Sequence, residues 1–200
     1  MEAEDRRKEL ETALLSENPE EIFQMLQKQG ALKKLLPELE NCVNFDQHHP
    51  KHHLDVFEHT LAVVAATPRD LGLRWAALLH DISKPLTRTI DDHGIGHFYG
   101  HNEKSADMAR KILTDLNYPP EFIDQVESLI HYHMIRLHVH TEKAVGRFTR
   151  KLGTQGVEKL IQLFRADKSA HKHIVGEDIE TEFEKIYRRL YTETDEKNKG

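Results

Sequence analysis

Helix boundaries recur along the whole chain and limit the folds open to it. In "SENPEEIFQMLQKQG", Asn18 is typical of a helix cap, Pro19 suits the first helical position and Gly30 suits the end. Apolar periodicity predicts further helices at about 31–39, 53–66, 71–82, 103–116, 120–137, 142–152, 154–170 and 178–191. Strand signals are poor, so the sequence predicts an all-α bundle of about eight or nine helices.

Composition excludes several classes of protein. The chain has 200 residues, enough for one domain with a small helical extension, and no apolar run could span a membrane. The formal charge of -6 argues against a broadly basic nucleic-acid surface. Cys42 is the only cysteine, so any metal would be bound by nitrogen and oxygen. The acidic first residues do not resemble a secretory signal, and we expect a cytoplasmic protein without a membrane partner.

Fifteen histidines in one chain are unusual, and helical spacing separates them into groups. In the helix predicted at 120–137, the apolar stripe contains Val126, Ile130 and Met134, and His133 lies within it. His131 lies roughly 200° away around the helix. We therefore expect His133, but not His131, to point inward.

Other inward polar groups fall on separate predicted helices. His59 lies between Val56 and Val63 on a helix that is apolar nearly all round. The apolar stretch "AALLHDISKP" ends at the pair His80-Asp81, and Asp167 continues the stripe of a later helix. Because an unpaired buried carboxylate costs several kcal/mol, Asp167 needs a partner.

Each inward histidine, taken singly, is more often a hydrogen-bonded core residue than a metal ligand. Taken together with His101, three or four imidazoles and two carboxylates form a ligand set of the zinc, manganese or non-haem iron kind. The joint interpretation is a metal site. In "DQHHPKHH", a solvated position or the edge of a substrate site is expected for His48, His49, His52 and His53. The remaining histidines are expected at the surface or just behind the ligands, namely His93, His97, His138, His140, His171 and His173. The glycine-rich segment 87–101 is expected to be a loop beside the site.

These residues resemble the HD-domain superfamily of metal-dependent phosphohydrolases. "HDISKP" looks like the family's HD motif, with Ser83 where most relatives have glycine. The resemblance is closer to the HD region of the bacterial CCA-adding enzyme and poly(A) polymerase group, on "LLPEL", "HHLDVFEHTL", "HFYGHNEKSA" and "RADKSA". The nucleotidyltransferase head of that group is not recognisable here, so the chain is either a stand-alone HD protein or an excised region. The expected division is an N-terminal helical extension at 1–45, an HD domain at 46–192 and a disordered tail at 193–200.

The resemblance implies a ligand set and a reaction. His59, His80, Asp81 and Asp167 would bind a first divalent metal, and His101 and His133 a second, with Asp81 bridging. The metal, one or two ions, could be Fe, Mn, Ni, Co, Zn or Mg. The implied activity is hydrolysis of a phosphomonoester or phosphodiester of a nucleotide, of 2′,3′-cyclic phosphodiesterase or nucleotidase type, with Asp81 catalytic. By position, Lys84 is predicted to be catalytic and to contact the phosphate of a nucleotide, and Arg147 is predicted to contact it too. The alternative for both is a surface cation, and it is the stronger alternative for Arg147.

A second interpretation remains open. The chain could be a noncatalytic helical module derived from a tRNA nucleotidyltransferase, supporting tRNA binding or oligomerisation. The link to tRNA rests on resemblance alone, and the sequence does not indicate the oligomeric state.

Overall fold

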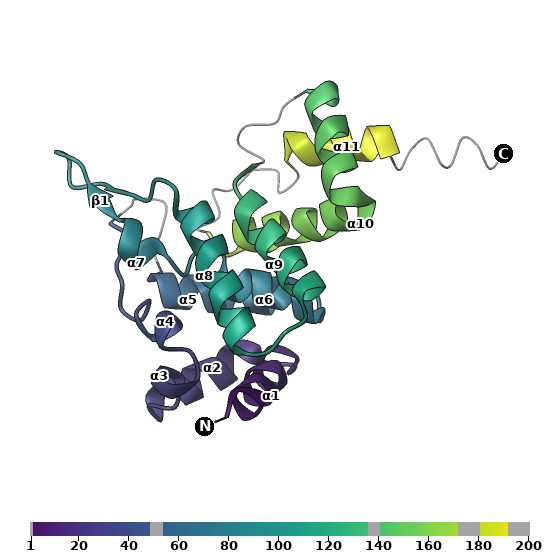
Figure 1. The fold of residues 1–200 in the computed structure, drawn as a ribbon. Helices are drawn as coiled ribbons and strands as arrows, with labels where there is room; N and C mark the ends of the chain where they lie inside the picture. The colour runs from purple at the N-terminus through teal and green to yellow at the C-terminus, as the bar shows by residue number, and fades with distance from the viewer. Residues whose placement is uncertain (1, 49–53, 136–140, 172–180, 192–200) are drawn as a thin grey trace.

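A computed structural model of the chain describes residues 2–48, 54–135, 141–171 and 181–191 (Figure 1). These residues form helices α1 (Ala3–Leu14), α2 (Pro19–Lys28), α3 (Leu32–Leu35), α4 (Pro37–Glu40), α5 (Val56–Ala66), α6 (Leu71–Leu79), α7 (Lys84–Thr87), α8 (His101–Asp115), α9 (Pro120–Tyr132), α10 (Glu142–Ser169) and α11 (Glu182–Tyr191). A hairpin of β1 (Thr89–Ile90) and β2 (Gly96–His97) is the only sheet among the described residues. The prediction of an all-α fold is confirmed.

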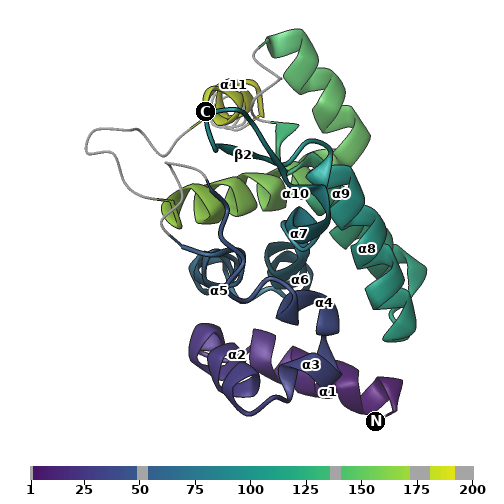
Figure 2. The ribbon, with the colours of Figure 1, turned by 90° about the vertical axis from the view of Figure 1, so that its left-hand side faces the viewer.

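Helices α5 and α6 lie at the centre of the molecule. Figure 2 shows α1, α2 and α3 on one side of this pair and α10 on the other. The antiparallel helices α8 and α9 pack along the side, with α9 against α6. Every residue of α6 from Gly72 to Leu79 is buried, which explains why this helix is apolar all round. The polar residues at its C-terminal end, His80 and Asp81, therefore lie in the interior.

Local sequence explains where the central helices begin. α5 begins after Asp55, which accepts a hydrogen bond from the backbone N–H of Glu58 while Glu58 accepts one from the backbone of Asp55. The helix expected from residue 53 starts at Val56 because this capping box sets its first turn. α6 begins after Asp70, whose carboxylate accepts from the backbone N–H of Leu73.

The described residues form more helices than the eight or nine expected, because α1 and α7 were not among them and because one expected segment is divided into two short helices. The helix expected at 31–39 is two, α3 and α4, because Pro37 cannot continue the hydrogen-bond ladder of α3. The helix expected at 71–82 ends at Leu79, and α7 follows after a turn. Asn18 occupies the cap position of α2, but its side chain makes no capping hydrogen bond.

The predicted separation between helices at 142–152 and 154–170 corresponds to a kink inside α10. Gly153 lies at φ 73° and ψ 162°, a backbone conformation that interrupts the helix and that glycine adopts without strain. The second segment of α10 packs across the core, and Asp167 is carried on it.

The segment expected to be a loop contains the small hairpin. Thr89 pairs with His97 and Ile90 with Gly96, antiparallel. A turn joins the strands, in which Gly94 has φ +77° and donates to the carbonyl of Asp91. Two residues in each strand are too few for periodicity to reveal them in the sequence.

The N-terminal helices are bound to the rest through Arg74 of α6. Its guanidinium is 5% exposed and donates to the carbonyls of Leu14, Ser16 and Thr67. Apolar side chains on both sides of residue 45 belong to one core cluster, so the domain boundary there stays a prediction. The tail expected at 193–200 lies outside the described residues. No helix among the described residues is long and apolar enough to cross a membrane.

Candidate metal centre

The six predicted ligands come from separate elements and meet at one place. His59 lies on α5, His80 ends α6, Asp81 follows it, His101 begins α8, His133 ends α9 and Asp167 lies near the end of α10. All six are buried, and the most exposed of them, His101, is only 8% exposed. Titratable side chains this deep must be paired or bind a cation.

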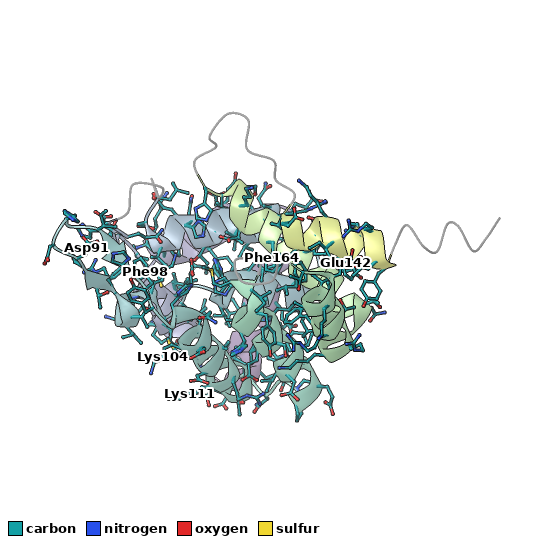
Figure 3. All side chains as sticks on the ribbon, turned by 90° about the horizontal axis from the view of Figure 1, so that it is seen from above. Asp91, Phe98, Lys104, Lys111, Glu142 and Phe164 are labelled. Carbon is teal, nitrogen blue, oxygen red and sulfur yellow. The ribbon has the colours of Figure 1, made fainter. Side chains whose placement is uncertain are left out.

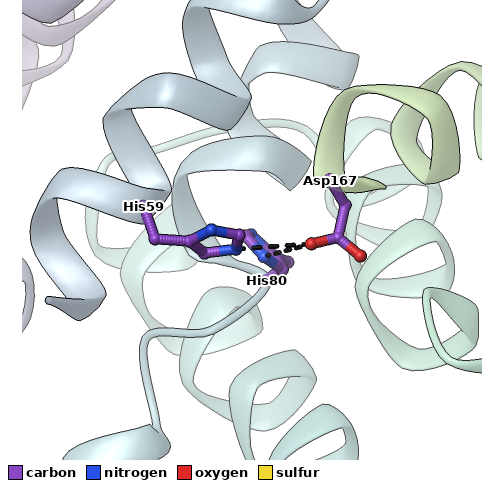
Figure 4. A group of neighbouring side chains, drawn as sticks. All are labelled: His59, His80 and Asp167. Carbon is purple, nitrogen blue, oxygen red and sulfur yellow. Dashed lines mark ion pairs between the residues drawn. The ribbon is translucent and has the colours of Figure 1, made fainter. Parts of the chain in front are cut away.

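His59, His80 and Asp167 form one group of donor atoms. Figure 4 shows the two imidazoles and the carboxylate pointing toward one another from three helices. The Nε2 atoms of His59 and His80 lie 3.3 and 3.9 Å from Asp167 Oδ1. One potential ligand atom from each residue falls within 4.8 Å of the others, a spacing that a single metal ion could fill.

Asp81, His101 and His133 form a second group of the same kind. The Nε2 atoms of His101 and His133 are 3.2 Å apart. Asp81 Oδ1 lies 3.4 Å from the first and 3.9 Å from the second.

Asp81 stands between the two groups. While its Oδ1 faces His101 and His133, its Oδ2 lies 3.2 Å from His80 Nε2 and 3.6 Å from His59 Nε2. Each carboxylate oxygen therefore serves a different group. This is the arrangement of a carboxylate that can bridge two cations.

Backbone carbonyls orient three of the imidazoles. The Nδ1 atoms of His80, His101 and His133 lie 2.7 to 2.8 Å from the carbonyl oxygens of the residues three positions earlier. A carbonyl only accepts, so Nδ1 carries the proton, and in the neutral ring Nε2 presents a lone pair inward. Metal-binding histidines are oriented by such contacts.

Burial keeps most of these imidazoles neutral. It lowers the pKa of His133 to about 3 and also lowers the pKa values of His59 and His101. Burial would likewise lower the pKa of His80, but the negative charge of Asp81 outweighs it and raises the value. Burial would raise the pKa of Asp81, yet the positive charges of His80 and Lys84 hold it well below its usual range.

These features fit a divalent cation. Neutral His101 and His133 direct Nε2 lone pairs at each other across 3.2 Å, a contact that a shared cation stabilises and that two acceptors alone do not. His80 Nε2 and Asp81 Oδ1 are buried without a hydrogen bond among the described residues. The donor set is nitrogen and oxygen only, which suits several divalent metals.

A pocket of about 280 Å³ opens onto this centre. Five of the six predicted ligands, all except His59, and Lys84 contribute to its walls, together with residues 96–99 at the end of the hairpin. Lys84 Nζ lies 2.7 Å from Asp81 Oδ2 and 2.7 Å from Gln47 Oε1, and it sits 5.2 Å from the centre of the Phe98 ring. A positive charge thus lies beside the candidate metal ligands and lines the same pocket.

Ser83, two residues after Asp81, secures the same region. Its hydroxyl donates to the carbonyl of His101 at 2.8 Å and accepts from the hydroxyl of Ser105. The turn that carries Asp81 is thereby bonded to the start of α8.

Arg147 does not join the site. Its side chain is exposed on α10, and it is not among the residues that line the pocket. The structure gives no support to the prediction that Arg147 contacts substrate, because only the opposite face of that helical turn, with Val145 and Phe148, is buried.

His171 is closer to the site than the sequence suggested. Its ring stacks on His59 with centroids 4.9 Å apart, and its Nε2 lies 3.3 Å from Asp167 Oδ1. The spacing of four residues from Asp167 was the signal that could have identified it. His97 also borders the pocket, whereas His48 and His93 are exposed. The other histidines expected near the surface, His49, His52, His53, His138, His140 and His173, lie outside the described residues.

Comparison with known proteins agrees with this geometry. The family model described as HD domain matches residues 56–171, which include all six candidate ligands. A second model, described as "Probable RNA and SrmB- binding site of polymerase A", matches residues 6–43.

Curated relatives match both regions. The chain is 36% identical over 177 residues to the CC-adding tRNA nucleotidyltransferase of Thermus thermophilus, covering 86% of this chain and 40% of the relative. It is 35% identical over 170 residues to the A-adding tRNA nucleotidyltransferase of Deinococcus radiodurans, covering 82% and 38%. It is 38% identical over 147 residues to the Multifunctional CCA protein of Aromatoleum aromaticum, covering 70% and 34%.

The chain thus spans about two fifths or less of the length of these relatives. The HD-domain match, in contrast, covers more than half of the chain itself and coincides with the buried His/Asp centre. The chain belongs to the HD-domain family.

Proposed function

We propose that the chain is a metal-dependent phosphohydrolase that cleaves a phosphomonoester or phosphodiester of a nucleotide, of 2′,3′-cyclic phosphodiesterase or nucleotidase type. One observation carries this proposal. Two groups of three buried donors lie beside a pocket that Lys84 also lines. Asp81 turns one carboxylate oxygen toward each group. A histidine cluster that served only the stability of the fold would not require an adjoining pocket or the positive charge of Lys84 beside it.

Each set would hold one divalent ion, which when bound supplies a hydroxide at neutral pH and neutralises charge on a phosphoryl group. His59, His80 and Asp167 would hold the first, and His101 and His133 the second, with Asp81 shared. Asp167 and His171 both line the pocket beside this centre. Nitrogen and oxygen ligands suit Fe, Mn, Ni, Co, Zn or Mg, and the choice among these is left to measurement.

Lys84 would orient the phosphate of the substrate. Two of its three N–H groups are accounted for by Asp81 and Gln47 among the described residues, which leaves one for a phosphate oxygen. Burial at 6% exposure strengthens this interaction, because water screens it little. The same contacts keep Lys84 in place in the absence of substrate.

The test is hydrolysis by protein stripped with chelator and reloaded with each candidate metal, using 2′,3′-cyclic AMP and AMP as substrates. At least one metal should restore phosphate-ester cleavage. Lys84→Met should lower kcat/KM by about 10- to 100-fold without changing metal content, and Lys84→Arg should retain more activity. Loaded protein that cleaves neither substrate with any metal would refute the proposal.

A second candidate function is favoured by the comparisons. The relatives are named for the transfer of nucleotides to tRNA, and residues 6–43 match a model described as an RNA-binding site. These findings support a tRNA-related role more directly than they support a free nucleotide as substrate. We therefore propose, as the alternative, that the chain supports tRNA binding or oligomerisation within a tRNA-processing protein, with a vestigial metal centre.

Filter binding of tRNA and size determination separate the two candidates. If the module is noncatalytic, tRNA should bind or the chain should self-associate, and Asp81→Ala should leave both unchanged. Hydrolysis that depends on metal and on Asp81, without measurable tRNA affinity, would decide for the first candidate.

A further inference from the structure

Tyr99 is an exposed aromatic side chain at the mouth of the pocket. It is 76% exposed, the largest value among the exposed large hydrophobic residues described. One face of its ring is stacked on His97, with centroids 5.5 Å apart and an angle of 8° between the planes. Since the side chain remains so exposed, the opposite face is open to a flat ligand.

The hairpin holds this stacked pair in a defined orientation. Asp91 Oδ2 lies 2.8 Å from His97 Nε2, and Asp91 Oδ1 accepts from the backbone N–H groups of His93 and Ile95. In Figure 3, Asp91 lies at the outer end of the hairpin and Phe98 lies closer to the helices. The hydrogen bonds of Asp91 fix the His97 ring, and the His97 ring fixes the plane of Tyr99.

The base of the hairpin is fixed to the segment that holds Lys84. The N–H of Gly96 donates to the carbonyl of His48 at 2.7 Å, and a Cβ at Gly96 would come within 2.2 Å of the carbonyl oxygen of Gln47. Gln47 is the residue whose side chain accepts from Lys84. Residues 47 and 48 therefore contact both the hairpin that carries the His97–Tyr99 pair and the side chain of Lys84.

The stacked pair and the metal ligands border the same space. Tyr99, His97 and Phe98 line the pocket that His80, Asp81 and Lys84 also line. A ligand whose phosphate lies near Lys84 would have its next group within this pocket, beside a flat aromatic surface. A nucleotide has this shape, with a flat base joined to phosphate through a sugar.

We propose that Tyr99 is a stacking platform for the nucleobase of the substrate, so that the site takes nucleoside phosphates in preference to phosphate esters without a base. This inference rests on the proposed phosphohydrolase function and specifies its substrate class. Stacking on an aromatic face tolerates any base, because every base has a π-face. The site should therefore discriminate nucleotide from sugar phosphate strongly and adenine from uracil weakly.

The test uses binding to the metal-loaded protein, measured by calorimetry with two ligands that resist hydrolysis. These are the 5′-phosphonate analogues of AMP and of ribose 5-phosphate, which differ only in the base. Wild type should bind the AMP analogue at least tenfold more tightly. Tyr99→Ala should remove most of that difference and leave the affinity for the ribose analogue unchanged, whereas Tyr99→Phe should retain it.

Tyr99 is not part of the hydrophobic core that the described residues form, so thermal unfolding of Tyr99→Ala should match wild type and exclude a folding defect. Equal affinities of wild type and Tyr99→Ala for the AMP analogue would overturn the inference, as would equal losses for both ligands. If the loaded protein hydrolyses no phosphate ester but the Tyr99-dependent preference persists, the stacking platform stands and the hydrolase proposal alone fails.

Discussion

The two ends of α6 carry the same type of residue in opposite environments. At its start, Asp70 is 42% exposed in its side chain, caps the helix and pairs with Lys159 at 2.9 Å. At its end, Asp81 is 2% exposed and is surrounded by His59, His80, His101 and His133. Nine of the ten residues between them form α6, which is apolar except for Arg74.

The contrast separates stability from function. Asp70 satisfies orphan N–H groups at a helix start, which stabilises the fold at little desolvation cost. Asp81 is held at the helix end, where the C-terminal dipole disfavours a negative charge and burial adds to the cost. Asp81 is therefore better explained by metal binding than by a contribution to the stability of the fold. Variants along α6 can test this.

The largest effect is expected for Asp81→Ala. Both ligand groups lose a shared donor, so metal content should fall to background and hydrolysis should drop by more than about 100-fold. Metal analysis of the purified variant and the phosphate-ester assay measure the two losses. The control is Asp107→Asn, an exposed carboxylate on α8 that should change neither. Retention of wild-type metal content by Asp81→Ala would remove the basis of the proposed centre.

Arg74→Ala, in the middle of α6, should affect stability and spare the metal. It leaves three backbone carbonyls without their donor, and we expect the free energy of unfolding to fall by about 3 kcal/mol. Urea denaturation measures this loss. Arg69→Ala is the matched control, because Arg69 is 51% exposed and its 3.6 Å pair with Glu17 contributes little. Similar losses for both variants would show that Arg74 does not join the N-terminal helices to α6.

Replacing one ligand from either group should halve the number of metal ions bound per chain. His59→Ala removes a donor of one group and His101→Ala a donor of the other, so each should lower a stoichiometry of two ions to one. Activity should fall by about 10- to 100-fold in both. The double variant should bind none. A stoichiometry of one in wild type, lost in both single variants, would instead show that the two groups form one site.

The smallest effect is expected at the other end of the helix. Asp70→Asn keeps the cap and loses the charge pair with Lys159, which should cost about 0.5 kcal/mol at pH 7. Burial raises the pKa of Asp70, but Lys159 and the N–H of Leu73 outweigh it and lower the value below 3.8.

The sign of this pH dependence follows from proton linkage. A carboxyl whose pKa is lower in the folded state contributes stability above its unfolded value, and this contribution is lost as the pH falls through the folded value. The difference between wild type and Asp70→Asn should therefore shrink below about pH 3.8, as followed by urea denaturation across pH. A difference that stayed constant down to pH 2 would assign the effect to the cap instead.

Periodicity was informative wherever a residue lies on a long helix. The stripe on α9 predicts that His133 points inward, and the structure has it 2% exposed while His131 is partly exposed. Asp167 and His59 were found in the same way, because a polar residue within an apolar stripe is visible in the sequence. The break near Gly153 followed from the same pattern.

Residues on short or irregular segments were harder to place. Arg147 has a plausible residue type, but the rotation of its helix turns it to solvent. His171, two residues beyond the end of α10, and Tyr99, two residues after β2, border the pocket through long-range packing that periodicity does not encode. The capping of α5 at Asp55 and the split at Pro37 shifted helix ends by a few residues for local reasons.

The sequence by itself determined the helical class, the inward faces of the main helices and the identity of the candidate ligands, because these depend on residue type and on a 3.6-residue period. Only the tertiary structure decided that the ligands fall into two groups, that Asp81 turns one oxygen toward each, and that a stacked His97–Tyr99 pair borders the same pocket. These depend on how helices cross and where a hairpin docks. Such distances of a few ångströms are set by packing among residues far apart in the chain.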